Sequence, residues 1–353
     1  MHTTIPPHTR SPLDSLACVN ERCELYGQAG QQNLIVRKVY GQDRIRYLRC
    51  RACGCEFSER KRTALWNTKG PRGLPEAKAI AVGEHLAEGC SLKGTARLVQ
   101  VDASTVRRLN WRFGEHGQAF HEARVQAVQV ETVQADERHG YAGDKGQPAW
   151  EAELMDPVSK FVISHVQGRR NEQLIRALLM DGASRLASPQ DLVLFTDGEP
   201  SYATLFPEIF GQPYRPHRAS HRGRPPKLRF RIPRSLAHVQ VIKHREGKRV
   251  THIEIRYAHG TKPRVAQALT RLAYLTPNTS AIERRNGTAR RMSAYQVRKT
   301  LAFARRPESK VALGWWGVTV YNWCRPHRML RQQLPEPVGK KSTKDVHQPW
   351  RWA

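Results

Sequence analysis

Residues 128–136 read Val-Gln-Val-Glu-Thr-Val-Gln-Ala-Asp, and this stretch decides the fold that we expect for the centre of the chain. Apolar and polar residues alternate along it, which is typical of a strand with one buried face. The stretch ends on the acidic pair Asp136-Glu137. Residues 150–155 and 160–167 predict a second and a third strand, joined by an Asp-Pro turn.

A helix and a buried strand are predicted next. Residues 171–186 have the spacing of an amphipathic helix. Residues 191–196, Asp-Leu-Val-Leu-Phe-Thr, have a continuous apolar centre that suits a buried position in a sheet, and Asp197 follows them. Three strands, a helix, a strand and another helix predict a mixed α/β sheet. We therefore expect Asp136 and Asp197 to lie side by side at the ends of neighbouring strands.

Paired carboxylates at one edge of a sheet indicate a site for divalent metal ions. Two such ions, roughly 3.5–4 Å apart, can clamp the attacking and leaving oxygens of a phosphoryl transfer, and Mg²⁺ (or Mn²⁺) suits oxygen ligands. The third acid that we expect is Glu283, on a predicted helix that Thr279 or Ser280 could cap. Each acid alone has a simpler interpretation, because a strand-end Asp is often a turn residue and a helical Glu is usually solvated.

The composition indicates a polyanionic partner. Among 353 residues, 59 are Lys or Arg and 31 are Asp or Glu, a formal net charge of +28. Basic residues are interleaved with apolar ones along the chain, so we expect nucleic acid as the partner, ahead of a ribosomal or membrane-surface role. The chain has no run of about 18 apolar residues and no apolar signal core, which predicts a cytoplasmic protein that does not cross a membrane. Its length allows two or three domains.

In such a compartment the seven cysteines are expected to be thiols or metal ligands. A C-x4-C pair and a C-x2-C pair flank two short predicted strands, residues 33–40 and 44–49. This arrangement predicts a structural zinc site with four thiolates, whose binding energy would help so small a segment to fold. The expected ligands are Cys18, Cys23, Cys50 and Cys53. The nearby Cys55 could replace the last of these, and unligated thiols in a small core are the alternative.

Residues 74–112 predict helices of the helix-turn-helix type. Pro75 suits a first helical turn, Ala96 is small where two helices would pack closely, and Asp102 suits the N-cap of the last helix. That helix, residues 103–112, would present a polar and basic face to a DNA major groove. The residues expected on this face are Ser104, Thr105, Arg107, Arg108 and Arg112. A plain helical hairpin with a solvated basic face is the alternative.

Three sequence blocks carry a resemblance to a known family. They are Asp136-Glu-Arg-His-Gly-Tyr-Ala-Gly-Asp-Lys145, Thr196-Asp-Gly-Glu-Pro-Ser-Tyr202, and Ile282-Glu-Arg-Arg-Asn286 followed by Val297-Arg-Lys-Thr-Leu-Ala-Phe303. In this order, and over about residues 18–313, they resemble the insertion-sequence-one family of DDE transposases, which open with a zinc knuckle and a helix-turn-helix. The resemblance implies an RNase H-like catalytic core with Asp136, Asp197 and Glu283 as the metal-binding triad. It also implies cleavage of a transposon end and strand transfer to target DNA.

Basic residues near these acids are expected to hold the DNA backbone. The candidates are Lys145, Arg284 and Arg285, with Arg290 and Arg291 in the same cluster. Residues 321–330, Tyr-Asn-Trp-Cys-Arg-Pro-His-Arg-Met-Leu, are similar to the C-terminal edge of integrase-like cores. A helix end with a solvated basic turn is the alternative interpretation of that stretch.

The spacing of the acids departs from the family pattern. Asp197 and Glu283 are 86 positions apart, against 61 between Asp136 and Asp197. We expect the excess to be an insertion near residues 211–262, a basic and Pro-rich stretch followed by a hairpin. The predicted hairpin strands are 238–244 and 249–257. Within the insertion, Arg222-Gly-Arg-Pro225 is similar to the core of an AT-hook, a minor-groove binder, with a solvated loop as the alternative.

The sequence as a whole predicts a multidomain α+β protein. The expected segments are a flexible N-terminus (1–14), a zinc ribbon or knuckle (15–62), a helix-turn-helix domain (70–122), an RNase H-like catalytic domain (126–330) and a flexible tail (331–353) with Trp350 and Trp352. We expect a prokaryotic, nucleoid-associated transposase that acts on transposon ends and target DNA as a homodimer or higher oligomer. A domesticated, non-catalytic regulator and a hydrolytic nuclease of the same fold are the alternatives.

Overall fold

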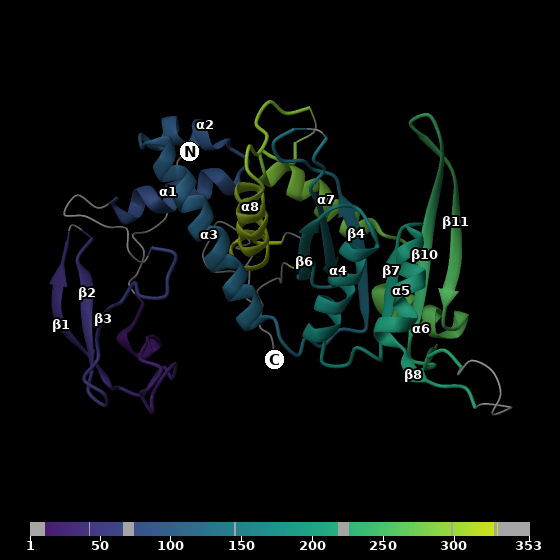
Figure 1. The fold of residues 1–353 in the computed structure, drawn as a ribbon, viewed down its shortest axis with the longest axis horizontal. Coiled ribbons are helices and arrows are strands. Elements are labelled where there is room, and N and C mark those ends of the chain that lie inside the picture. Colours follow the sequence, from purple (N-terminus) through teal and green to yellow (C-terminus); the bar gives the residue numbers. More distant parts are fainter. Residues whose placement is uncertain are drawn as a thin grey trace, which may run out of the picture.

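A computed structural model of the chain describes residues 11–41, 43–65, 74–144, 146–217, 226–297, 299–327 and 330 (Figure 1). A small sheet at the N-terminal end, a group of three helices and a large mixed sheet follow one another along the molecule. None of the helices in the described part is long and apolar enough to cross a membrane. Lys145, Arg222-Gly-Arg-Pro225, Trp350 and Trp352 lie outside the described residues.

The small sheet has three antiparallel strands in the order β1-β2-β3, and a short 3-10 turn, η1 (Leu13–Ser15), precedes it. Their bounds are Leu34–Tyr40, Ile45–Cys50 and Glu56–Ser58. The first two strands lie within one residue of their predicted positions. The buried core of this unit consists only of Cys18, Cys23, Leu34, Leu48, Cys50 and Phe57. Because half of these residues are cysteines, apolar packing alone offers this unit little stability.

The three helices are α1 (Glu76–Ala87), α2 (Leu92–Val99) and α3 (Ala103–Arg124). Ser91 and Asp102 cap α2 and α3, since their side-chain oxygens accept hydrogen bonds from the Gly94 and Ser104 amides at 3.0 and 2.7 Å. The predicted N-cap at Asp102 is therefore confirmed. Pro75 is the N-cap residue of α1 and not its first helical residue. Ala96, Val106 and Leu109 are buried where the helices meet.

Helix α3 continues twelve residues beyond its predicted end at residue 112, and its second half packs along α8 (Pro307–Thr319). The two helices come close because α3 has glycines at the contact. A Cβ atom at Gly114 would overlap the backbone of Ala312, and one at Gly117 would overlap the Thr319 side chain. Asn110 also donates to the Ser309 carbonyl at 3.1 Å. Helix α3 thus joins the helical group directly to the domain that contains the large sheet.

The large sheet has six strands in the order β11-β10-β7-β4-β5-β6 (Figure 1). The strands are β4 (Thr132–Arg138), β5 (Trp150–Met155), β6 (Val162–Gly168), β7 (Val193–Thr196), β10 (Ala237–Glu246) and β11 (Arg249–His259). The three central strands, β10, β7 and β4, run parallel to one another, and the outer pairings are antiparallel. This is the mixed α/β sheet that the sequence predicts.

Helices cover both faces of this sheet. Helices α4 (Glu172–Arg185) and α5 (Pro200–Phe210) pack on one face, against alternate strand residues such as Ala135 and Leu194. On the other face, α6 (Lys262–Leu272) packs against Val193 and Phe195. Helix α7 (Ser280–Met292) lies over β4 and β5 on that face, and α8 with the π-helical turn η2 (Val320–Cys324) lies over β6.

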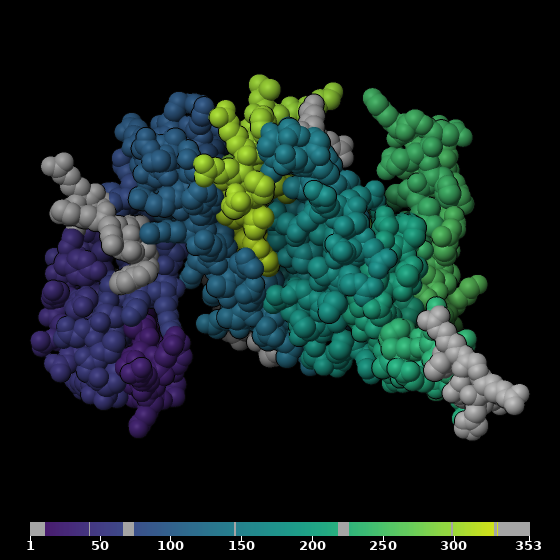
Figure 2. Space-filling view, in the orientation of Figure 1, coloured from purple at the N-terminus to yellow at the C-terminus, as the bar shows by residue number. Residues whose placement is uncertain are grey.

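Two features differ from the predicted strand pattern. Strand β4 begins at Thr132, because Val128 instead bridges to Leu186, and the strand runs on to Arg138, so Asp136 lies within it and not at its end. The segment predicted as an insertion, 211–262, contains a small ribbon, β8 (Gln212–Tyr214) with β9 (Arg229–Arg231), and the predicted hairpin. The hairpin is part of the large sheet, since β10 pairs with β7. Its far end stands clear of the rest of the molecule in Figure 2.

Candidate metal centre and nucleic-acid interface

Three carboxylates meet at one place on the large sheet. Asp136, Glu137 and Asp197 offer oxygen atoms that all lie within 4.8 Å of one another, and we call this group the acid cluster. The strand register explains the meeting, because Gln134 on β4 lies beside Phe195 on β7 and each Asp comes two residues later. The structure therefore brings together the two aspartates as the sequence predicts.

The first two acids are neighbours on β4 and face opposite sides of the sheet, as successive strand residues do. Asp136 accepts a hydrogen bond from Asn286 of α7 at 2.8 Å. Glu137 accepts one from the buried Tyr202 hydroxyl of α5 at 2.5 Å. Both side chains are therefore oriented by a helix that packs on their own side of the sheet. Asp197 accepts from the Glu199 amide at 3.0 Å, in the turn that begins α5.

The charges in the acid cluster are poorly compensated by the protein. Burial raises the pKa of Asp136 to about 6, and the negative charges of Asp197 and Glu283 add to the effect. Burial raises the pKa of Glu137 to about 7, against the hydrogen bond from Tyr202. Burial also raises the pKa of Asp197.

Among the described residues, Arg170 is the basic side chain that pairs with the cluster. It lies 3.9 Å from Glu137, is 47% exposed, and also contacts Glu199 at 3.3 Å. A divalent cation would supply the missing positive charge, and three oxygen donors within 4.8 Å fit Mg²⁺ or Mn²⁺. The donor set and its charge therefore suit a hard divalent ion.

The third predicted acid, Glu283, is not in the acid cluster; Glu137 is. Glu283 lies in the first turn of α7, where it pairs with Lys243 of β10 and accepts from the Thr279 hydroxyl at 2.6 Å. Thr279 occupies the N-cap position, where its carbonyl accepts from the Glu283 amide but its side chain makes no capping hydrogen bond. The charge of Glu283 still raises the pKa values of Asp136 and Asp197, so this carboxylate lies within electrostatic reach of both.

The sequence contained a signal for Glu137 that the prediction did not use. Glu137 was noted only as part of an acidic pair at a strand end. Strand β4 continues past Asp136, so the next residue, Glu137, faces the opposite side of the sheet. Its side chain is long enough to bring a carboxylate oxygen within 4.8 Å of Asp197. Tyr202, the last residue of the second sequence block (196–202), donates a hydrogen bond to Glu137 on that same face.

Arg285 does not occupy the position expected of a DNA contact. Its side chain is 2% exposed, its guanidinium lies 4.1 Å from the centre of the Tyr321 ring, and it donates to Glu153 at 2.9 Å. The helical phase of α7 turns it inward, while its neighbour Arg284 is exposed. The expectation that Arg285 meets DNA is thus corrected, because the residue is buried within the protein.

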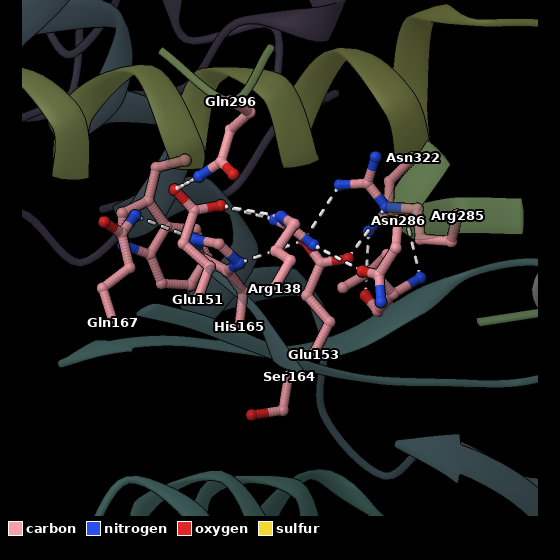
Figure 3. A network of polar contacts seen from close by, with 12 residues as sticks. Arg138, Glu151, Glu153, Ser164, His165, Gln167, Arg285, Asn286, Gln296 and Asn322 are labelled. Carbon is pink, nitrogen blue, oxygen red and sulfur yellow. Dashed lines mark hydrogen bonds and ion pairs between the residues drawn. The ribbon is translucent and has the colours of Figure 1, made fainter. Parts of the chain in front are cut away.

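Arg285 belongs to a second group of charges, the buried network, shown in Figure 3. Arg138 of β4 donates to Glu151 at 2.5 Å and to Glu153 at 2.7 Å, both on β5. Lys310 of α8 donates to Glu151 at 2.5 Å. Burial alone would raise the pKa of each glutamate, but the adjacent cations hold the pKa values of Glu151 and Glu153 well below their usual range.

The buried network reaches the acid cluster through one residue. The Asn286 side-chain oxygen accepts from Arg138 at 3.1 Å, and its amide nitrogen donates to Asp136. Since Asn286 is itself 3% exposed, its orientation is fixed on both sides. The position of Asp136 is thereby tied to the packing of α7 and β5.

The four predicted zinc ligands also meet. Their sulfur atoms all lie within 4.8 Å of one another, with 3.7 Å between Cys18 and Cys53 and 3.9 Å between Cys23 and Cys50. Zn–S bonds of about 2.3 Å in a tetrahedron require sulfur atoms about 3.8 Å apart, so these residues fit zinc. The alternative ligand Cys55 is outside this group.

Hydrogen-bond donors contact Cys50 and Cys53, whereas burial raises the pKa of the Cys18 thiol to about 12. The Asn33 side chain donates to Cys50 Sγ at 3.2 Å. A hydrogen bond from the Asn20 side chain, helped by the Cys55 amide, lowers the pKa of Cys53 to about 6. Metal-binding cysteines are held by such donors in the same way. The site therefore has the ligands and the supporting contacts that a structural zinc ion uses.

The predicted DNA-facing residues of α3 lie on its outer side. Ser104, Arg107 and Arg108 are exposed, and Thr105 and Arg112 are partly exposed. Their positions are compatible with contact to a groove or to phosphates.

Comparison with known proteins finds distant structural similarity. No protein-family model matches the chain, and no curated protein matches it. A piggyBac transposase synaptic complex with hairpin DNA is similar at 8% identity and a TM-score of 0.35, over 71% of this chain and 66% of that one. The Mos1 strand transfer complex aligns at 13% identity and a TM-score of 0.19, over 72% and 79% of the two chains. A pre-cleavage Mos1 transpososome aligns at 11% identity and a TM-score of 0.20, over 72% of this chain and 80% of that one. The functional interpretation rests on the geometry of the site.

Proposed function

We propose that this protein is a DNA transposase that cleaves transposon ends and transfers the strand to target DNA with divalent metal ions. One observation supports this most directly: in a chain with net charge +28, three carboxylates offer oxygen atoms within 4.8 Å of one another on a mixed sheet, and the cation paired with them in the described part of the chain, Arg170, is half exposed. An acidic centre in a basic protein suits a metal-dependent reaction on a polyanion. The resemblance of the sequence blocks to the insertion-sequence-one family adds the reaction class.

Asp136, Glu137 and Asp197 would hold the ions. Bound there, Mg²⁺ or Mn²⁺ would activate water and stabilise the charge that develops on the attacking and leaving oxygens. Asn286 keeps one oxygen of Asp136 turned toward α7, and Tyr202 holds one oxygen of Glu137. The other oxygen of Asp136 accepts from the Glu137 amide at 2.8 Å, and the other oxygen of Glu137 lies 3.9 Å from Arg170. Phosphodiester energy is conserved when a 3′ hydroxyl attacks a new strand, so the reaction needs no nucleotide cofactor.

We retain Glu283 as a member of the reactive centre during the reaction. Its carboxylate is paired with Lys243, a half-buried residue of β10 that follows the buried part of the strand. A DNA phosphate that binds Lys243 would compete with Glu283 for that ammonium group. Glu283 would then be free to join the metal-binding carboxylates. In this proposal Lys243 couples the arrival of DNA to completion of the triad.

The N-terminal part would recognise the transposon ends. We propose that the four cysteines bind zinc and stabilise the small sheet, and that α2 and α3 form the helix-turn-helix with Arg107 and Arg108 on the reading face. The segments predicted as flexible, 1–14 and 331–353, lie outside the described residues except for 11–14, where the Ser11 carbonyl accepts from Arg46 at 2.8 Å. A homodimer or higher oligomer in the prokaryotic cytoplasm would bring two ends together. A regulator without catalytic activity would use the same DNA-binding surface.

Joining of pre-cut DNA tests the proposal. Purified protein is mixed with Mg²⁺ or Mn²⁺, a plasmid target, and duplexes that carry the flanking terminal repeats, either intact or already cut to leave the 3′ hydroxyl. We expect cleavage of the intact duplex and joining of the pre-cut duplex, with neither in Asp197→Asn. Specific binding without joining by the wild type would favour the regulator, and cleavage without joining would favour a hydrolytic nuclease.

A further inference from the structure

A cavity of about 630 Å³ lies along α7, away from the acid cluster. Ala281, Arg284, Thr288 and Arg291 line it from that helix. Their spacing of three or four residues places them on one side of α7. Asn286, which contacts Asp136, lies on the opposite side of the same helix. The cavity is therefore a separate feature of the domain.

The lining of this cavity is strongly basic. Its cationic residues come from the β5–β6 turn, from the ends of α6 and η2, and from α7, and they are Lys160, Arg271, Arg284, Arg291 and Arg325. None of the lining residues in the described part of the chain is Asp or Glu. Because like charges repel, five cations around one space disfavour the empty arrangement and favour an anion within it.

Few carboxylates offset these charges from outside the cavity. Arg291 and Arg325 share Glu88, at 3.7 and 3.9 Å, and that glutamate side chain is 64% exposed. Arg271 pairs with Glu131 at the surface. Arg284 makes no ion pair with any described residue. Exposed pairs such as these stabilise little, by about 0–1 kcal/mol, so most of the positive charge remains available to a ligand.

Two cations in the wall are also incompletely solvated. Nη1 of Arg325 is buried without a hydrogen-bond partner among the described residues. Burial lowers the pKa of Arg325, and the nearby Arg291 lowers it further. Burial lowers the pKa of Lys160 as well. An anion in the cavity would give Arg325 Nη1 the hydrogen bond that it lacks, and it would add negative charge near Lys160, whose ammonium group already donates to the Pro157 carbonyl.

We propose that this cavity binds the phosphate groups of a DNA backbone. Arg284 and Arg291 are seven residues apart, roughly 10 Å along the helix axis, so the charge spans more than one phosphate. A polymer with a phosphate at every nucleotide satisfies such a row better than one small ion. The inference rests on the proposed function only in taking DNA as the polymer. It assigns to α7 two roles, with Asn286 at the acid cluster and Arg284 at the phosphates.

The test uses the full chain and a duplex of arbitrary sequence in EDTA, so that no cleavage occurs. Equilibrium binding is measured at several salt concentrations for wild type and for the double variant Arg284→Gln/Arg325→Gln. We expect binding about tenfold weaker or more, because charge-assisted hydrogen bonds are lost. The slope of log K against log salt should fall by about 0.9 for each lost phosphate contact. Arg176→Gln, which removes one charge on the other face of the sheet at α4, should bind like wild type.

Each outcome decides the matter. Wild-type affinity and salt slope in the double variant, with an unchanged melting temperature, would overturn the proposal. Arg284→Gln alone covers the case in which the double variant is unstable, since Arg284 is exposed. In a second arm, inorganic phosphate is titrated by calorimetry. Phosphate binding that the variant loses, together with unchanged DNA affinity, would identify a site for a free anion and would also overturn it. A wild type that binds no DNA would instead refute the proposed function.

Discussion

Two groups of carboxylates lie one strand apart in the same sheet, and their charges are treated in opposite ways. In the buried network, Glu151 and Glu153 on β5 are matched by Arg138, Arg285 and Lys310, and their pKa values are held low. In the acid cluster, Asp136 and Glu137 on β4 have raised pKa values, and the cation that pairs with Glu137 in the described part of the chain, Arg170, is half exposed.

This difference distinguishes structural acids from ligand-binding acids. A buried carboxylate with cations at 2.5–2.9 Å already has its counter-charge, so an added metal ion would gain little there. A group of acids that repel one another is unfavourable by itself and becomes favourable when a cation binds. The acid cluster lowers the stability of the metal-free fold and prepares it for an ion. The buried network fixes the helix that orients Asp136.

The largest effect should follow removal of one ligand charge from the acid cluster. We expect Asp197→Asn to reduce strand cleavage by about 10³-fold or more, because several kcal/mol of transition-state stabilisation depend on the bound ions. DNA binding should stay near wild type, and the melting temperature without metal ions should not fall, because burial already disfavours the charge of Asp197. Single-turnover cleavage measures the loss. Asp191→Asn is the matched control, since it makes the same change at the other end of β7. Wild-type cleavage by Asp197→Asn would remove the basis of the proposed function.

The opposite result is expected in the buried network. Glu153→Gln should lower the free energy of unfolding by about 3–5 kcal/mol, since Arg138 and Arg285 would then remain buried without their shared counter-charge. Urea denaturation followed by circular dichroism measures this change. Glu172→Gln, in an exposed pair with Arg176, should change stability by less than about 0.5 kcal/mol. If Glu153→Gln lowers the free energy of unfolding by less than about 1 kcal/mol, the buried network does not have the stabilising role that we assign to it.

The sequence predicted the elements of both groups but distinguished them incompletely. Strand alternation located β4, a continuous apolar run located β7, and the expectation that acids after neighbouring strands meet paired Asp136 with Asp197 correctly. Cysteine spacing located the metal-binding sulfurs, because a C-x4-C and a C-x2-C pair on turns can converge on one ion. These features could be predicted because each depends on the backbone conformation of a short segment of sequence.

The network could not be predicted because it depends on contacts between distant residues. Glu151 and Glu153 alternate with apolar residues on β5 and look like solvent-facing positions until α7 and α8 cover them. Arg285 was expected to meet DNA for the same reason, since an arginine in a basic helix is usually exposed. Strand β10 was assigned to an insertion because only its parallel pairing with β7 reveals it as part of the sheet.

A third test uses pH in the absence of metal ions. The pKa of Asp136 is raised from 3.8 to about 6 in the folded state, so the folded protein binds more protons than the unfolded chain between these values. Stability due to this group is therefore present at low pH and is lost as pH rises from about 4 through 6. We expect Asp136→Asn in EDTA at pH 8 to be more stable than wild type by about 1–3 kcal/mol. The two should converge near pH 4, and added Mn²⁺ should reverse their order.

This experiment separates the acid cluster from every other carboxylate. The buried network is present in both proteins, so the difference between wild type and variant reports the charge of Asp136, including its effect on the pKa of Glu137. A variant that is less stable than wild type at pH 8 in EDTA would mean that the carboxylate is compensated by the protein, and the proposed distinction between the two groups would fail.

The smallest effect, and the one that sharpens the comparison most, concerns the identity of the third carboxylate. Without DNA, Glu283 is expected to stay with Lys243 while Glu137 contributes to the ion site. Calorimetry should then find Mn²⁺ binding about tenfold weaker in Glu137→Gln and nearly unchanged in Glu283→Gln. With terminal-repeat DNA bound, Glu283→Gln should impair cleavage, because DNA phosphates would have taken Lys243. Lys243→Met should release Glu283 without DNA and strengthen Mn²⁺ binding, whereas Lys248→Met, at the hairpin tip, should not. If Glu283→Gln weakens Mn²⁺ binding in the free protein and Glu137→Gln does not, Glu137 is a structural acid held by Tyr202. Its role would then resemble that of Glu151 and Glu153 in the buried network, although it lies in the acid cluster.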